Sequence, residues 1–280
     1  MLAEVQSPIS PNAINGIAEA HIWARGVSVD FAHAGQTTRV LHNIDLSIPR
    51  GGFVSLIGPS GCGKSTLLKV LAGLLQPAEG EVQVAGVSPG EAARQRRIGL
   101  VFQEATLMPW KNALDNVKVL MEVAYKDRSK ADITQRATDM LRLVGLEKAA
   151  LKRPSQLSGG MRQRVSVARA LAMDPEVLMM DEPFGALDAI TREEMNEFLL
   201  EIWQRTGKTI VFVTHSIDEA VFLSQQVLVM GTGPARIIES IPIDLPYPRV
   251  EQTYLLPAFA VASGRLRRLL KDGHALKAAS

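Results

Sequence analysis

The sequence predicts an α/β fold with a mostly parallel sheet, flanking helices, an N-terminal antiparallel β edge and an inserted helical lobe. Three observations predict it. Continuous apolar runs at 53–57, 177–180 and 209–213 are typical of parallel strands that are covered on both faces. A glycine-rich segment and then an apolar helical pattern follow the first run, which gives the order strand, loop, helix. Helical spacing of apolar residues from about 112 to 145 indicates the separate helical lobe.

The N-terminal part of the chain precedes this core. Residues 1–19 are polar and rich in proline and asparagine, which favours a flexible arm. Strand-like stretches at 22–31 and 40–48 predict the antiparallel β edge. The expected regions are the arm at 1–19, the main domain at 20–250 with its helical lobe at about 104–172, and a C-terminal tail at 251–280.

The composition is that of a globular chain without a strong charge bias. Of its 280 residues, 46% are hydrophobic and 21% are charged, which suffices for a large core. The 31 Lys and Arg residues nearly balance the 29 Asp and Glu residues, and the net charge of +2 argues against a nucleic-acid partner. The single cysteine, Cys62, cannot form an internal disulfide and favours a reducing compartment. No apolar run reaches the roughly 18 residues of a membrane helix, so we expect membrane contact through another protein.

The segment Gly58–Thr66 (GPSGCGKST) has the residues that a phosphate-binding loop requires. Its glycines let the backbone curl with its N–H groups pointing inward, and the following helix adds the positive end of its dipole. Lys64 can reach the β and γ phosphates, the Ser65 hydroxyl can bind Mg²⁺, and Thr66 can reach the α-phosphate region. The predicted nucleotide-binding residues of this loop are Gly58, Pro59, Ser60, Gly61, Cys62, Gly63, Lys64, Ser65 and Thr66.

Two adjacent carboxylates, Asp181 and Glu182, follow the apolar run at 177–180. Open α/β sheets bind their ligands at the carboxyl ends of the strands. Neighbouring carboxylates repel each other unless a cation compensates them. We therefore expect Asp181 to hold the Mg²⁺ shell through water and Glu182 to polarise the attacking water as general base.

Six features in the same order resemble the ATP-binding cassette (ABC) ATPases over about residues 22–230. They are Gly58–Thr66, Gln103, Leu157-Ser158-Gly159-Gly160, Asp181-Glu182, Asp188 and His215. The LSGG motif is the specific part, because simple P-loop enzymes do not share it. The resemblance implies a P-loop NTPase core, ATP and Mg²⁺ as ligands, and a head-to-tail dimer with ATP between two ATPase subunits.

The resemblance also implies a role for each matching residue. Gln103 would contact Mg²⁺ and the attacking water, and His215 would hold the γ-phosphate and that water in place. The LSGG backbone, at the start of a helix expected at 162–173, would close on the γ-phosphate of the opposite subunit's ATP. The implied sets are Glu182, His215 and Gln103 for catalysis, Ser65, Gln103 and Asp181 for the metal, and Ser158, Gly159, Gly160 and Asp188 for the partner's nucleotide and the dimer seam.

An aromatic residue near the first strand stacks on adenine in this family, and Phe31 is the candidate here, with a core phenylalanine as the alternative. The histidines other than His215 show no metal-ligand spacing, and we expect them at the surface. They are His21, His33, His42 and His274.

Within the family, one branch fits the chain best. Missing membrane segments argue against exporters with fused membrane helices, and the short distance from Gln103 to Leu157 leaves no room for the coiled coil of a DNA-repair ATPase. A single cassette argues against the translation-factor type. A soluble ATPase of iron–sulfur assembly, with no permease, remains the alternative to an importer subunit.

The segment after Gln103, with Leu107 and Trp110, resembles the part that receives a permease's coupling helix in nitrate, sulfonate, taurine and bicarbonate importers of bacteria. The tail segments at 230–237 and 244–249 resemble the same group. Leu107 and Trp110 could instead be core residues of the helical lobe.

That resemblance implies a set of partners and a place in the cell. The partners are a second ATPase subunit, favouring a homodimer, two integral-membrane permease subunits and, indirectly, a periplasmic solute-binding protein. The place is the cytoplasmic face of the inner membrane, as a peripheral subunit. A basic helical pattern at 264–271 favours a solvated tail over one that contacts lipid head groups.

Overall fold

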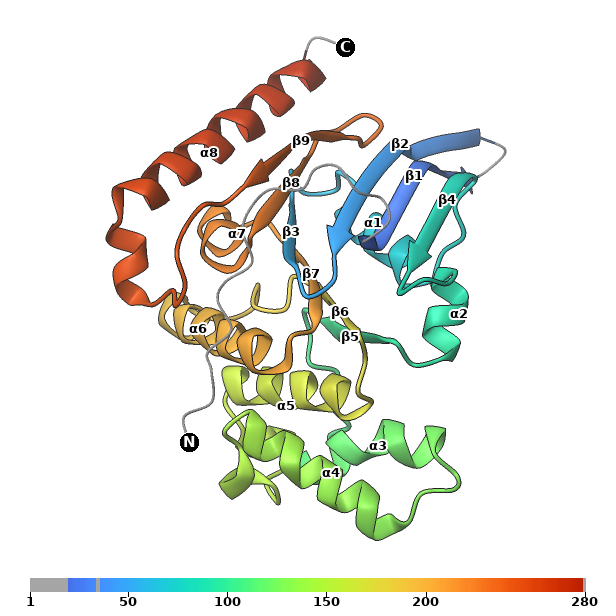
Figure 1. Ribbon diagram of the computed structural model, residues 1–280, viewed down its shortest axis with the longest axis vertical. Helices are drawn as coiled ribbons and strands as arrows, with labels where there is room; N and C mark the ends of the chain where they lie inside the picture. Colours follow the sequence, from blue (N-terminus) through green and yellow to red (C-terminus); the bar gives the residue numbers. More distant parts are fainter. Residues whose placement is uncertain (1–19, 34–35, 279–280) are drawn as a thin grey trace, which may run out of the picture.

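The computed structural model describes residues 20–33 and 36–278, which form two sheets, helices that flank them and a separate group of helices (Figure 1). The arm expected at 1–19 lies outside the described residues. None of the helices in the described part combines the length and apolar character needed to cross a membrane.

The smaller sheet is antiparallel, with strand order β2-β1-β4. Its strands are β1 (Ala20–His33), β2 (Gln36–Pro49) and β4 (Glu79–Val84). Ile22 of β1 pairs with Ile48 of β2, and both side chains are buried. Buried and exposed residues alternate along β2, as expected for a sheet with one face on the core. This sheet confirms the predicted antiparallel edge.

The larger sheet has the strand order β5-β6-β7-β3-β8-β9 and is parallel except for β9. Its strands are β3 (Phe53–Ile57), β5 (Ile98–Phe102), β6 (Val177–Asp181), β7 (Thr209–Thr214), β8 (Gln226–Met230) and β9 (Ile237–Pro242). The three runs predicted as parallel strands are β3, β6 and β7, and they lie next to one another at its centre. Every residue of β3 and of β7 is buried, which explains their unbroken apolar pattern.

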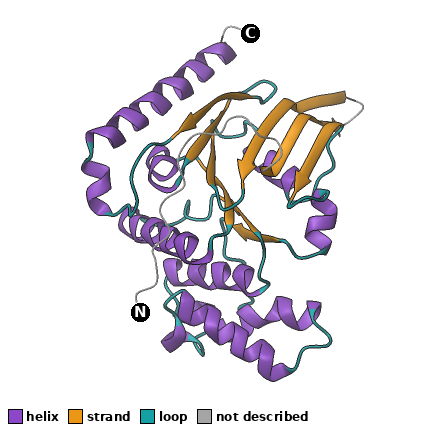
Figure 2. Ribbon diagram, viewed as in Figure 1, coloured by secondary structure: helices purple, strands orange, loops and turns teal. Residues whose placement is uncertain are grey.

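Helices cover this sheet and the smaller one (Figure 2). They are α1 (Lys64–Leu71), α2 (Pro89–Arg94), α6 (Ala189–Thr206) and α7 (Ile217–Leu223). Phe53, Phe184 and Phe212 form an aromatic cluster in the core beneath them.

A second group of helices lies at one end of the molecule, below the larger sheet in Figure 1. It contains α3 (Ala113–Ala124), α4 (Lys130–Leu143), the short 3₁₀ helices η2 (Glu147–Ala149) and η3 (Pro154–Gln156), and α5 (Gly159–Ala172). The side chains of Asn112, Ser129 and Ser158 cap the three α-helices by accepting a backbone N–H. Residues 125–129, which include the charged Lys126, Asp127 and Arg128, connect α3 to α4.

The C-terminal tail forms a helix whose basic residues Arg265, Arg267, Arg268 and Lys271 are exposed, as expected for a solvated basic pattern. A 3₁₀ helix, η4 (Glu251–Leu255), leads into the long helix α8 (Pro257–Ala278), which packs on α7 and β8. Phe259 and Leu266 are buried, because apolar residues recur on one face between the basic ones.

The expectation that His21 lies at the surface is wrong. Its ring is buried where β1 crosses the ends of β6 and β7, with Nδ1 2.6 Å from Thr209 Oγ1 and Nε2 3.3 Å from a Glu176 carboxylate oxygen. Burial is the main cause that lowers the pKa of His21, and the nearby Arg50 charge adds to it. His42 is exposed as expected, and the side chains of His33 and His274 lie outside the described residues.

Candidate nucleotide-binding site

The phosphate loop lies between the end of β3 and the start of α1. Gly63, the residue before α1, has φ +103°, and a Cβ there would lie 2.8 Å from Leu41 Cδ2. A Cβ on Gly58 would lie 2.7 Å from the Met230 carbonyl oxygen. Glycine is therefore required at both positions. At Gly63 the positive φ and the lack of space both disfavour a side chain, and at Gly58 the lack of space alone excludes one.

Lys64 spans this loop. Its Nζ donates hydrogen bonds to the carbonyl oxygens of Gly58, at 2.9 Å, and of Pro59, at 3.0 Å. The side chain is only 5% exposed. The loop carbonyls thus hold the ammonium group at the N-terminus of α1, where the helix dipole also favours an anion.

Ser65 and Asp181 come from different elements and meet beside the loop. Ser65 Oγ donates a hydrogen bond of 2.8 Å to Asp181 Oδ1. Burial is the main cause that raises the pKa of Asp181, and the neighbouring Glu182 charge adds to it, while Ser65 and the Lys64 charge act in the opposite direction. A hydroxyl and a carboxylate are the oxygen ligands that Mg²⁺ prefers, so these two residues fit that ion.

Glu182 and His215 face each other at the ends of β6 and β7. His215 Nδ1 lies 3.0 Å from Glu182 Oε2. Glu182 has φ +45°, an uncommon conformation for a residue with a side chain, and its N–H donates to the Val213 carbonyl at 2.9 Å. Both side chains are partly exposed. Strands β6 and β7 therefore fix the backbone here. The Glu182 carboxylate and the His215 imidazole both lie at the carboxyl-terminal edge of the larger sheet.

Gln103 follows β5 and lies next to the turn after Glu182. Its Nε2 lies 3.2 Å from the position of a Cβ on Gly185. Gln163 of α5 donates a hydrogen bond of 2.9 Å to the carbonyl oxygen of Phe102. The structure therefore brings Gln103 to the carboxylate edge and ties the residue before it to the helical group.

The LSGG segment lies at the N-terminus of α5. Ser158 is exposed and accepts a hydrogen bond of 3.2 Å from the Met161 N–H. Cβ atoms on Gly159 and Gly160 would lie 3.0 Å from the Leu187 side chain and 2.9 Å from the Thr191 side chain, so these glycines let the start of α5 pack closely against the loop and helix at 187–191. Within the described part of the chain, no hydrogen bond joins Ser158 to its own phosphate loop.

Asp188 begins α6 beside this segment. Its carboxylate accepts a hydrogen bond of 3.0 Å from the Thr191 N–H, and hydrogen bonds to Thr191 are the main cause that lowers the pKa of Asp188. Asp188 is exposed, as is its neighbour Ile190. Ser158 and Asp188 thus lie close together on one surface of the chain.

Phe31 is 42% exposed near the end of β1, so the alternative of a core phenylalanine is wrong. Cys62, inside the phosphate loop, is buried, and burial raises the pKa of its thiol. This favours an inert structural cysteine over a reactive one.

Trp110 is 70% exposed, which excludes a core role for it, whereas Leu107 is partly buried against the core. The segment that carries both is anchored by a buried asparagine. Asn116 accepts the Met108 N–H at 2.7 Å and donates to the carbonyls of Met108, Lys111 and Asn112.

Arg169 of α5 holds the start of the same segment. It donates to the carbonyl oxygens of Ala105, at 2.8 Å, and Thr106, at 2.9 Å. Sequence reasoning missed Asn116 and Arg169 as anchors. The available signal was an asparagine at a core-facing helical position.

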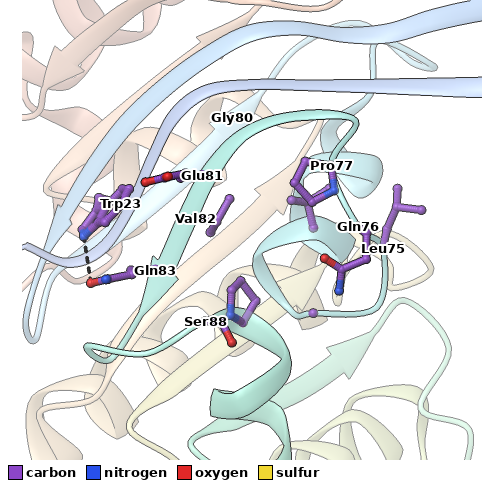
Figure 3. Close-up of a pocket in the computed structure, with 12 residues that line it drawn as sticks. Trp23, Leu75, Gln76, Pro77, Gly80, Glu81, Val82, Gln83 and Ser88 are labelled. Atoms are coloured by element: carbon purple, nitrogen blue, oxygen red, sulfur yellow. Dashed lines mark hydrogen bonds between the residues drawn. The ribbon is translucent and has the colours of Figure 1, made fainter.

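A pocket lies away from these residues, elsewhere in the described part of the chain. It has a volume of about 320 Å³ and lies beyond the C-terminal end of α1, between β1, β4 and the start of α2. Trp23, Val82 and Gln83 line it, and Trp23 Nε1 donates to Gln83 (Figure 3). It contains none of the predicted phosphate-loop residues.

Comparison with known proteins agrees with this geometry. A sequence model of the ABC transporter family matches residues 41–185. The chain is 44% identical over 255 residues to the taurine import ATP-binding protein TauB of Pseudomonas aeruginosa, covering 90% of this chain and 95% of that protein. It is 45% identical over 224 residues to the aliphatic sulfonates import ATP-binding protein SsuB of Bacillus cereus, covering 80% and 86%.

A solved structure of an ATP-binding cassette also resembles this chain. A dimeric ATP-binding cassette in a post-hydrolysis state, bound to ADP and phosphate, superposes with a TM-score of 0.70 at 32% identity and covers 80% of this chain and 100% of that one. The phosphate loop, the carboxylate edge, the LSGG helix and these likenesses together place the chain in the ABC transporter family, as an ATPase cassette.

Proposed function

We propose that this chain is the ATP-binding and hydrolysing subunit of a bacterial importer that takes up a small anion of the taurine or sulfonate type, within a group that also includes nitrate and bicarbonate importers. The observation that carries the proposal is a doubly anchored segment at 104–111 with an exposed tryptophan, directly after Gln103 of the nucleotide site. The names of the relatives favour this function over iron–sulfur assembly.

Nucleotide binding begins at the phosphate loop. Lys64 exchanges its two loop carbonyls for the β- and γ-phosphate oxygens, which are stronger partners because they are charged. The loop N–H groups and the N-terminus of α1 hold the remaining phosphate charge. Exposed Phe31 offers its ring face for stacking on adenine.

Ser65 and Asp181 would hold Mg²⁺, Asp181 through water, and Gln103 would complete the shell. The bound ion would neutralise charge on the β- and γ-phosphates. Its presence also relieves the cost of a buried Asp181 carboxylate beside Glu182.

Hydrolysis requires a base and a group that orients it. Glu182 accepts a proton from the attacking water, and His215 keeps the Glu182 carboxylate aimed through the 3.0 Å contact at Nδ1. Gln103 positions the water from the side of β5. Hydrogen bonding of the Glu182 backbone to β7 limits movement of this carboxylate.

The other half of each site comes from a second copy of the chain. Ser158, Gly159 and Gly160 present backbone N–H groups at the start of α5, and an anion is favoured there by the helix dipole. Among the described residues no hydrogen bond joins this segment to its own phosphate loop, and we assign it to the partner's γ-phosphate, with Asp188 at the dimer seam.

The permease would bind at Trp110. Asn116 and Arg169 hold the backbone on either side of Leu107, so the exposed indole is presented from a rigid support. Two integral-membrane subunits would dock one on each cassette, which would make this chain a peripheral subunit at the cytoplasmic face of the inner membrane. A periplasmic binding protein would then select the solute.

The experiment that tests this function is uptake by the reconstituted transporter. The chain is co-expressed with a permease and a periplasmic binding protein of a taurine importer, and radiolabelled taurine uptake into vesicles is measured with ATP inside. Uptake that stops when Lys64→Ala replaces the native chain supports the proposal. Failure of the chain to co-purify with any membrane protein would favour the iron–sulfur assembly alternative.

A further inference from the structure

A series of buried polar contacts begins at the residue before His215. Thr214, the last residue of β7, donates its hydroxyl hydrogen to the Glu219 carboxylate. The same hydroxyl oxygen accepts the Ser216 N–H at 2.9 Å. Thr214 and Ser216 flank His215, so these contacts fix the backbone on both sides of the histidine.

Glu219 of α7 in turn faces Arg192 of α6. Glu219 Oε1 lies 3.8 Å from Arg192 Nε, and the Glu219 side chain is almost fully buried. Burial is the main cause that raises the pKa of Glu219, and the Arg192 charge acts against it. No acceptor among the described residues lies within hydrogen-bond distance of Arg192 Nε, which is itself buried.

Arg192 completes the series at the loop before α6. Its Nη2 donates a hydrogen bond of 2.7 Å to the Leu187 carbonyl oxygen. Leu187 packs against Gly159 of the LSGG segment and precedes Asp188. The Arg192 guanidinium therefore donates to the loop at Leu187, which we assign to the partner's nucleotide. On its other side it lies near the Glu219 carboxylate, which holds the backbone next to His215.

The 3.8 Å distance is longer than a charge-assisted hydrogen bond, which is about 2.7–2.9 Å. The opposite charges attract each other at this separation, and water screens them little on the Glu219 side, whose side chain is 7% exposed against 30% for Arg192. Arg192 therefore joins Glu219 through charge and Leu187 through a hydrogen bond.

We propose that Glu219 and Arg192 are positioning residues that link His215, at the subunit's own nucleotide, to the Leu187–Asp188 loop, at the partner's nucleotide. Contact of His215 with its own subunit's nucleotide then sets the position of the Leu187–Asp188 loop at the partner's nucleotide. This inference rests on the shared-site dimer of the proposed function.

The test uses heterodimers purified through two different affinity tags. One subunit carries Glu182→Gln, so that only the other subunit's site hydrolyses ATP, and single-turnover phosphate release is measured. Glu219→Gln, which removes the charge but keeps the shape, is placed either in the hydrolysing subunit or in its partner. Small misplacements of reacting groups cost about 10²-fold in rate, so we expect losses of about 10- to 100-fold in both placements, with ATP affinity unchanged.

The matched control is Glu201→Gln, which breaks the exposed Glu201–Arg205 pair of 3.1 Å on the same helix as Arg192. It should leave the rate unchanged in either subunit. Arg192→Lys keeps the charge but shortens the reach to Leu187, and it should reproduce the loss in the partner placement.

A rate that falls only when Glu219→Gln is in the hydrolysing subunit would overturn the inference, since a local structural role acts only there. If Glu219→Gln does not fold, Arg192→Lys in the hydrolysing subunit decides instead: a local role at Leu187 acts only on the partner's nucleotide, so an unchanged rate in this placement would overturn the inference. A parent heterodimer that releases no phosphate, with neither substitution present, would instead contradict the shared-site dimer itself.

Discussion

Replacement of Trp110 by alanine separates a docking residue from a residue that stabilises the fold. The indole is 70% exposed, and substitutions at such surface positions change the free energy of unfolding by about 0.5 kcal/mol or less. A 1 kcal/mol change shifts Tm by about 2–4 °C in proteins near this size, so we expect a shift of about 2 °C or less.

Binding to the permease should respond much more. A central interface tryptophan contributes about 2–4 kcal/mol or more, which corresponds to a loss of about 30- to 1,000-fold in affinity. ATP binding and hydrolysis by the isolated subunit should stay unchanged, because Asn116 and Arg169 hold the segment without help from the indole. The assays are a thermal melt, an ATPase measurement and a titration of the variant against detergent-solubilised permease.

Two control variants calibrate the result. Trp203 is 9% exposed and donates to the Gly51 carbonyl at 2.9 Å, so Trp203→Ala should cost about 3–5 kcal/mol and lower Tm clearly. Leu255, 83% exposed at the end of η4, serves as an exposed apolar residue remote from the segment. A Trp110→Ala protein that melts like Trp203→Ala, or that binds the permease like Leu255→Ala, would refute the reasoning.

Further predictions concern the catalytic site and the buried histidine. Glu182→Gln removes the base and should lower turnover by about 10²- to 10⁴-fold while ATP still binds; gel filtration should then show an ATP-dependent dimer, and normal turnover would remove Glu182 from the mechanism. Lys64→Ala should weaken ATP binding itself, measured by equilibrium titration, because the ammonium group that meets the phosphates is gone; unchanged affinity would count against the phosphate loop. His21 has a lowered pKa in the folded state, so the unfolded chain binds more protons near pH 6; stability that His21 provides above pH 6.5 should fall as the pH drops through 6.5. Denaturant titrations should therefore show a smaller loss of stability between pH 7.5 and 6 for His21→Gln than for the native chain, and an equal loss would contradict the assignment.

The elements that the sequence predicted are those whose physical cause is local. The run at 53–57 and the glycines after it specify a buried strand and a tight phosphate loop by themselves, and both are present. The helix at 162–173 was predicted from its apolar spacing; it begins three residues earlier, at Gly159, where the short-range cap of Ser158 starts it. The prediction of Asp181 and Glu182 at a strand end likewise needed only the apolar run before them.

Features that depend on distant partners were not predicted. His21 is buried because Thr209 and Glu176, far away in sequence, cover it. The edge strand β9 forms by antiparallel pairing with β8, and no strand was predicted there from the sequence. Long-range pairing overrides local propensity in such cases.

Arg249 is the clearest example of this limit. It is buried, and its guanidinium donates to the carbonyl oxygens of Val221, Phe222 and Ser224 at the end of α7. A charge that is satisfied only by backbone carbonyls has no sequence signature, because any residue type can supply the acceptor. The anchoring of the Trp110 segment by Arg169 is hidden for the same reason.

The most direct test of the shared nucleotide site is a mixing experiment with two inactive variants. Ser158→Arg blocks the helix start that is assigned to the partner's γ-phosphate, and Lys64→Ala removes binding at the subunit's own phosphate loop. In a mixed dimer, the Ser158→Arg subunit still has an intact phosphate loop and receives an intact Ser158 from its partner. The account predicts that ATPase activity, absent from each variant alone, returns on mixing through this one complete site. An equimolar mixture that stays inactive although heterodimers form, or hydrolysis by a strictly monomeric native chain, would contradict it.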